Sequence, residues 1–139
     1  MEVLYTAVAT STGEGRNGHV RSDDGMIDFA LRRPKSMGGE GGHTNPEQLF
    51  AAGYSACYHN ALLRVSREAG VEIGETSVTA EVDLGKGDDG FGIGVALTVR
   101  IPAVDQATAE ALAARANEVC PYSKATRGNI PFSLTAIGG

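Results

Sequence analysis

The stretch that decides the fold is NPEQLFAAGYSACYHNALLRVSREAG, which runs from Asn45 to Gly70. Asn45 is a good helix N-cap, because its side-chain oxygen can accept a hydrogen bond from a backbone amide of the first turn. Pro46 suits the first helical position, where a missing N–H costs nothing. Gly70 can adopt the left-handed conformation that ends many helices. The stretch therefore predicts one long helix between Asn45 and Gly70.

The middle of this helix is apolar on almost every side between Leu49 and Leu63. A helix of that composition is normally buried. Small residues would let another backbone approach closely; they are Ala51, Ala52, Gly53, Ser55 and Ala56. Cys57, one of only 2 cysteines in the chain, follows them. We therefore expect a buried central helix that carries a cysteine.

Length and composition indicate one domain that spans the chain, with 139 residues and enough apolar side chains for a core. The net charge of −5 and the lack of a basic stripe argue against nucleic acid as a partner. No apolar run reaches the ~18 residues of a membrane span. The N-terminal segment MEVLYTAVATST lacks the features of a signal peptide. We expect a cytoplasmic protein without membrane partners.

The rest of the chain alternates between strand and helix patterns. Strands are expected at 4–11, 19–22, 26–32, 76–84, 91–101 and 129–137. A second helix, capped by Asp105, is expected to run to about Val119, and Pro121 is expected to stop it just after Cys120. Pro131 predicts that the last strand lies at a sheet edge or starts late. This order predicts an α+β fold, with antiparallel sheets packed on a long central helix.

Cys57 and Cys120 are the candidate reactive residues. An unperturbed thiol with a pKa of ~8.5 is only about 3% ionised at pH 7, so a reactive cysteine needs a cation beside it. Arg16 and Arg127 are the candidates, because a guanidinium is always charged. Cys120 falls at the C-terminal end of its helix, where the dipole disfavours a thiolate. It suits a partner for an oxidised thiol better than an attacking thiol.

Other interpretations stay open at this point, the first being that Cys57 is an inert core residue. A zinc site of Cys57, His59 and Cys120 is disfavoured, because residues two apart on a helix point about 200° apart. A cysteine hydrolase would need a histidine base, and the chain lacks a recognisable nucleophile motif; its histidines are His19, His43 and His59. Aromatic residues at helical spacing are core or interface residues by default, or line an apolar pocket: Phe50, Tyr54 and Tyr58.

Two segments, each centred on a cysteine, resemble signature segments of a known family. They are TNPEQLFAAGYSAC at 44–57 and VCPYSKATRGNI at 119–130. The segments LYTAVATSTGEGRNG, MGGEGG and GFGIGVALTV resemble the same family, in the same order. The chain therefore resembles, over nearly its whole length, the organic hydroperoxide resistance (Ohr) proteins of the Ohr/OsmC superfamily.

This resemblance implies a thiol peroxidase that reduces organic hydroperoxides to alcohols. Cys57 matches the peroxidatic cysteine of the family, and Cys120 matches the resolving cysteine. Arg16 matches the catalytic arginine, and Glu47 matches the carboxylate that orients it. The family implies an intertwined homodimer with its active sites at the subunit interface. It also implies that no cofactor is bound, and that an external dithiol, usually a lipoyl group on a protein, restores the thiols.

Apolar side chains near such a site are expected to favour alkyl or fatty-acid hydroperoxides; the candidates are Met37, Phe50 and Phe91. Two departures from the family concern the loop expected to cover the site and the substrate preference. Lys124 stands where the family commonly has asparagine, and the loop around His43 is one residue short. The alternative to a peroxidase is a non-enzymatic dimeric binding or stress protein of the same fold, with an inert buried Cys57.

Overall fold

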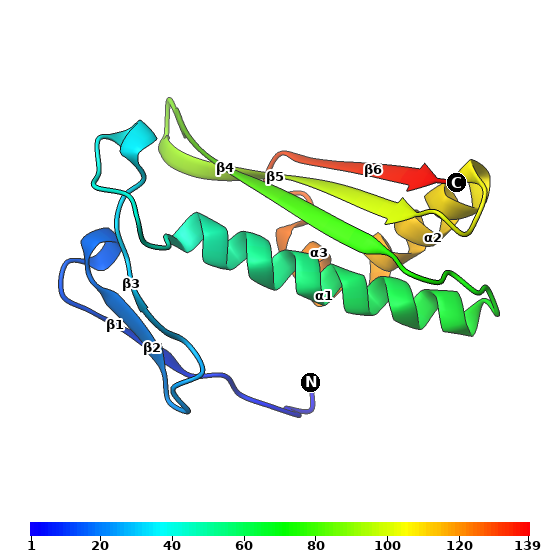
Figure 1. Cartoon of the computed structure of the whole chain (residues 1–139), viewed down its shortest axis with the longest axis horizontal. Helices are drawn as coiled ribbons and strands as arrows, with labels where there is room; N and C mark the ends of the chain where they lie inside the picture. The colour runs from blue at the N-terminus through cyan, green and yellow to red at the C-terminus, as the bar shows by residue number, and fades with distance from the viewer. The chain divides into compact units, whose positions relative to one another are not determined.

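The computed structural model describes residues 1–139, the whole chain, which forms two compact units (Figure 1). The N-terminal unit comprises residues 1–49, and the C-terminal unit comprises residues 50–139. Each unit contains one three-stranded sheet. No helix is both long enough and apolar enough to cross a membrane.

The N-terminal unit is an antiparallel meander with the strand order β1-β2-β3, as predicted. Its strands are β1 (Ala9–Thr12), β2 (His19–Ser22) and β3 (Asp28–Ala30), with short 3-10 turns at Gly15–Asn17 and Lys35–Met37. Gly25 has a φ of 75° and makes the turn between β2 and β3. The first strand begins at Ala9 rather than at residue 4, since the preceding residues have no strand partner within the chain.

The long helix α1 (Pro46–Glu68) begins and ends where its local signals predicted. The Asn45 side chain accepts a hydrogen bond from the Gln48 amide at 2.9 Å, as an N-cap does. Gly70 has a φ of 69°, and the Val71 amide donates to a carbonyl in the last turn of the helix. Capping at both ends therefore fixes the length of α1.

We also predicted that α1 is buried on every side. A single chain does not bury it completely. One face is buried, with its residues three or four positions apart: Tyr54, Tyr58, Ala61, Leu62 and Val65. A stripe along another face is exposed: Ala52, Ala56, Asn60 and Leu63. The apolar composition of the helix thus exceeds what one chain covers.

The C-terminal unit holds the second sheet, in the order β4-β5-β6. Its elements are β4 (Ser77–Gly87), β5 (Gly90–Ile101), α2 (Gln106–Val119), α3 (Pro121–Thr126) and β6 (Phe132–Gly138). Strands β4 and β5 are antiparallel, but β6 pairs with β5 in parallel, which corrects the prediction of purely antiparallel sheets. The chain returns to β5 through α2 and α3, the kind of crossover that a parallel pair requires. Strand β6 lies at the sheet edge, as Pro131 predicted.

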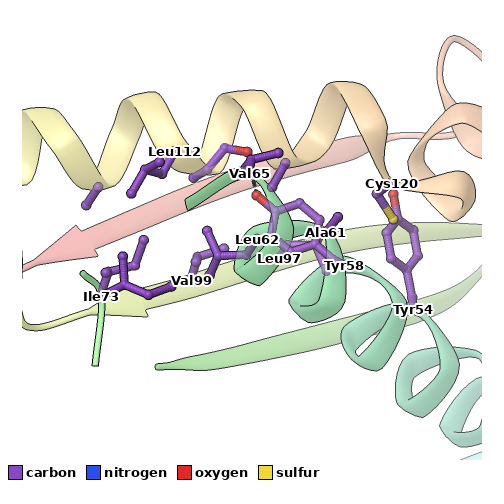
Figure 2. Packing of buried hydrophobic residues seen from close by; sticks show 14 of the residues in the cluster. Tyr54, Tyr58, Ala61, Leu62, Val65, Ile73, Leu97, Val99, Leu112 and Cys120 are labelled. Atoms are coloured by element: carbon purple, nitrogen blue, oxygen red, sulfur yellow. Dashed lines mark hydrogen bonds between the residues drawn. The ribbon is translucent and has the colours of Figure 1, made fainter. Parts of the chain in front are cut away.

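The core of this unit lies between its helices and its sheet. Alternate residues of β5, from Val95 to Ile101, are buried, because successive side chains of a strand point to opposite faces. They join the buried faces of α1 and α2 in one apolar cluster (Figure 2). The mixed architecture confirms the α+β fold class.

Pro121 has a different role from the predicted one. It occupies the first turn of α3 rather than simply ending α2, because proline is favoured at the first helical position. Cys120 therefore sits at a junction, as C-cap of α2 and N-cap of α3.

Candidate active site

The two cysteines meet inside the C-terminal unit. Their sulfur atoms are 3.7 Å apart, although the residues are separated by 63 positions, and the Cys120 thiol donates to the Cys57 sulfur. Both are free thiols; Cys57 is partly exposed and Cys120 is fully buried. A disulfide bond is about 2.05 Å long, so the sulfurs need to approach by only about 1.7 Å to form one.

The surroundings of Cys57 within this unit favour its neutral form. Burial raises the pKa of the Cys57 thiol, and the neighbouring Cys120 raises it further, while the backbone N–H of Tyr122 lowers it. The raising effects prevail. A peroxidatic role therefore requires a cation that stabilises the thiolate.

Arg16 and Glu47 form a bidentate ion pair in the N-terminal unit. The two guanidinium nitrogens of Arg16 donate to the two carboxylate oxygens of Glu47, each at 2.7 Å. Glu47 lies in the first turn of α1, and Arg16 lies in the 3-10 turn after β1. These hydrogen bonds lower the pKa of Glu47 and raise that of Arg16, against the opposing effect of burial. The pair fixes the orientation of a permanently charged guanidinium.

Replacing Glu47 with glutamine is expected to lower the stability at pH 7 by about 1–2 kcal/mol, less than for a fully buried pair, because the Arg16 side chain is 34% exposed. The folded-state pKa of Glu47 is below its unfolded value of about 4.3, so its stabilising effect is present above that pH. The effect is lost as the pH falls through the folded-state pKa. The difference between wild type and Glu47→Gln should therefore narrow below about pH 4.

Urea denaturation from pH 3 to pH 7 measures this difference. Glu68→Gln is a matched control, because Glu68 pairs with Arg64 on the exposed face of the same helix and should contribute little. A stability difference for Glu47→Gln that does not change with pH would contradict the ion-pair explanation.

The other proposed cation, Arg127, and two of the candidate histidine bases have partners of their own. The Arg127 guanidinium donates to the Asn117 carbonyl at 2.6 Å, near the end of α2. The His59 ring is hydrogen-bonded to the Thr76 hydroxyl at 2.8 Å, and His19 is paired with Asp28. No group of three or more His, Cys, Asp or Glu side chains is arranged to hold a metal ion.

An aromatic cluster joins α1, α3 and the start of β6. Its ring centroids are 5.7–6.4 Å apart, and its members are Phe50, Tyr54, Tyr122 and Phe132. A Cβ atom on Gly53 would lie 3.1 Å from the Tyr122 hydroxyl, so the glycine lets this ring lie against α1. Of these four residues the sequence predicted only Phe50 as a substrate contact, and it did not single out Tyr122 or Phe132 as its neighbours. The position of Tyr122 just after Cys120 was the available signal.

The structure thus forms two of the predicted pairs, one in each unit: Arg16 with Glu47, and Cys57 with Cys120. Of the other predicted substrate contacts, Met37 is 43% exposed in the N-terminal unit. Phe91 is 73% exposed at the start of β5, with the Lys86 ammonium 5.7 Å from its ring centroid. A substrate role for either residue stays a prediction.

Known proteins resemble this chain in both sequence and structure. A sequence model of OsmC-like proteins matches residues 39–135. The chain is 48% identical to an organic hydroperoxide resistance protein of Xanthomonas axonopodis pv. citri, over 96% of the chain and 95% of that protein. It is 47% identical to the organic hydroperoxide resistance protein OhrB of Bacillus subtilis, over 94% of the chain and 96% of that protein.

Solved structures agree. The crystal structure of an organic hydroperoxide resistance protein from Elizabethkingia anophelis superposes with a TM-score of 0.94 at 50% identity, and covers 100% of both chains. The chain therefore belongs to the OsmC-like family, and within it to the organic hydroperoxide resistance proteins. This confirms the resemblance inferred from the two cysteine-centred segments.

Proposed function

We propose that this protein is a cysteine-based peroxidase that reduces alkyl and fatty-acid hydroperoxides to alcohols. The observation that carries the proposal is the 3.7 Å approach of a partly exposed free thiol, Cys57, to a buried one, Cys120. Membership of the organic hydroperoxide resistance proteins supports it, because the relatives' names state resistance to this class of compound.

In the proposed reaction the Cys57 thiolate attacks the outer oxygen of the hydroperoxide. The O–O bond breaks, the alkoxide takes up a proton and leaves as an alcohol, and Cys57 becomes a sulfenic acid. The Cys120 sulfur then attacks the Cys57 sulfur. The S–O bond breaks and the oxygen leaves as water with the thiol proton, so that a Cys57–Cys120 disulfide remains.

Arg16 is proposed to supply the cation that the Cys57 environment lacks. Its guanidinium, oriented by Glu47, would stabilise first the thiolate and then the negative charge that develops on the leaving alkoxide. The bidentate geometry at 2.7 Å supports this role, because an oriented guanidinium need not reorganise during the reaction.

The proposed assembly is a homodimer with its active sites at the subunit interface. Two exposed surfaces of the single chain, which a second copy of the chain could cover, support this assembly. One is the exposed small-residue stripe of α1, which ends at Leu63. The other is the N-terminal segment before β1, whose large apolar side chains are exposed: Val3, Leu4, Tyr5 and Val8.

An external dithiol is proposed to close the cycle, with no cofactor bound to the protein. A dithiol such as a protein-borne lipoyl group attacks the disulfide, forms a mixed disulfide, and releases itself by closing its own S–S bond. Both protein thiols are thereby restored. We propose a cytoplasmic location, where reducing conditions would keep the thiols free between turnovers.

Titration of free thiols before and after one equivalent of tert-butyl hydroperoxide tests the proposal. Loss of both thiols in each chain is expected, since the first oxidation leads to the disulfide. No loss would favour the non-enzymatic binding protein instead, an alternative supported by the raised pKa of Cys57. A parallel assay that compares dihydrolipoamide with thioredoxin identifies the reductant.

A further inference from the structure

A buried tyrosine hydroxyl ties the two cysteine-bearing segments together. The Tyr54 hydroxyl lies 2.8 Å from the Ser123 hydroxyl and 3.2 Å from that of Thr126. Tyr54 is fully buried and Ser123 is 2% exposed. These are the only hydrogen bonds that join a side chain of α1 to a side chain of α3.

The two bonded residues stand in matching positions relative to the cysteines. Tyr54 precedes Cys57 by about one turn of α1, and Ser123 follows Cys120 by about one turn. Residues at that spacing lie on the same side of a helix. Tyr54 and Cys120 lie at the same end of the buried cluster in Figure 2. The hydroxyl bond therefore fixes α3 against α1 beside the sulfur pair.

We propose that Tyr54 and Ser123 are positioning residues that hold Cys120 in reach of Cys57, and so set the rate and equilibrium of disulfide formation. The inference rests on the proposed function and adds to it, because it assigns control of the second step alone. In that step the Cys120 sulfur bonds to Cys57, the sulfenic S–O bond breaks, and water leaves. Neither Tyr54 nor Ser123 gains or loses a proton in it.

Geometry explains why the second step alone depends on this bond. The sulfurs need to close by only about 1.7 Å, so any added freedom of α3 reduces the fraction of time that they spend in reach. Removing the hydroxyl of Tyr54 also takes away the hydrogen-bond partner of the buried Ser123 hydroxyl. The first step, in which Cys57 attacks the peroxide with the help of the proposed cation Arg16, does not involve the Cys120 sulfur, so its rate should stay close to the wild-type value.

Tyr54→Phe is the central variant, since it keeps the aromatic ring and removes only the hydroxyl. Its equilibrium constant for the Cys57–Cys120 disulfide, measured in dithiothreitol redox buffers, should fall by about fivefold to tenfold. After one equivalent of tert-butyl hydroperoxide, the Cys57 sulfenic acid should persist longer and react more fully with dimedone. The rate constant of its formation should stay at the wild-type value.

Tyr58→Phe is the matched control. The Tyr58 hydroxyl is equally buried on α1 but donates to the Ala113 carbonyl of α2 at 2.6 Å, so its loss leaves the hydrogen bonds between Tyr54 and α3 in place. Ser123→Ala removes the other half of the bond, and should weaken the disulfide in the same direction as Tyr54→Phe. The double variant should be little worse than either single one, because both remove the same interaction.

The proposal is overturned if Tyr54→Phe and Ser123→Ala, shown to be folded by circular dichroism, have the disulfide equilibrium and sulfenate lifetime of Tyr58→Phe. If Tyr54→Phe fails to fold, the same comparison with Ser123→Ala decides the question. The redox-buffer measurement needs no peroxide. If the wild-type protein does not react with peroxide, the proposed function is refuted. The equilibrium constants of the Cys57–Cys120 disulfide would still test the positioning role.

Discussion

Cys57→Ser is expected to abolish the reduction of alkyl hydroperoxides. The serine hydroxyl is not ionised near neutral pH and cannot pass through a sulfenic acid, so both the nucleophile and the intermediate are lost. Consumption of tert-butyl hydroperoxide in the presence of dihydrolipoamide measures the loss. The variant should fold normally, because serine is close to cysteine in size and Cys57 is partly exposed.

Cys120→Ser distinguishes the role of Cys120 from that of Cys57. It should consume one equivalent of hydroperoxide per chain at the wild-type rate and then stall as a Cys57 sulfenic acid, which dimedone labels. Sustained turnover of Cys120→Ser with the dithiol would contradict the resolving role. Residual turnover by Cys57→Ser would contradict the whole mechanism.

Arg16→Met is expected to lower the rate of peroxide reduction at pH 7 by about tenfold to a thousandfold. An adjacent positive charge lowers the pKa of an acid by about 1–3 units, and the environment of Cys57 otherwise raises it. In the proposed mechanism, loss of the Arg16 charge therefore reduces the thiolate fraction of Cys57. The rate of Cys57 alkylation by iodoacetamide, measured from pH 5 to pH 10, should show a higher thiol pKa in the variant.

Arg127→Met is the control for this prediction. It removes a guanidinium that donates to the Asn117 carbonyl, and so should leave the alkylation profile of Cys57 near that of wild type. If folded Arg16→Met and wild type show the same pH dependence of Cys57 alkylation, Arg16 is not the cation that stabilises the thiolate.

The ends of α1 could be predicted because they depend on local chemistry. Asn45 and Gly70 act through hydrogen bonds and backbone conformation within a few residues of themselves. The start of α3 at Pro121 was missed because proline after a helix both ends that helix and suits the start of another. The parallel pairing of β6 was missed because it depends on contacts between distant parts of the chain.

The candidate site likewise combines features that local sequence indicates with features that depend on contacts between distant residues. The residues suggested Cys120 as the partner of an oxidised Cys57, 63 positions away, but the assignment of this pair and of Arg16 with Glu47, 31 positions apart, came from the family resemblance. The residues alone left a metal site and a hydrolase open. Ser123 was missed, although a hydroxyl one turn from a candidate cysteine is a visible signal. Its importance depends on Tyr54, which only the folded chain brings to it.

The difference in exposure between the two thiols has a kinetic consequence in the proposed cycle. Cys120 is fully enclosed, so an incoming dithiol can attack only the Cys57 side of the disulfide. The hydroperoxide and the dithiol then react at the same atom, the Cys57 sulfur. Each must react and leave as product before the other can bind. Such an enzyme follows ping-pong kinetics, and a large excess of either reactant delays the other.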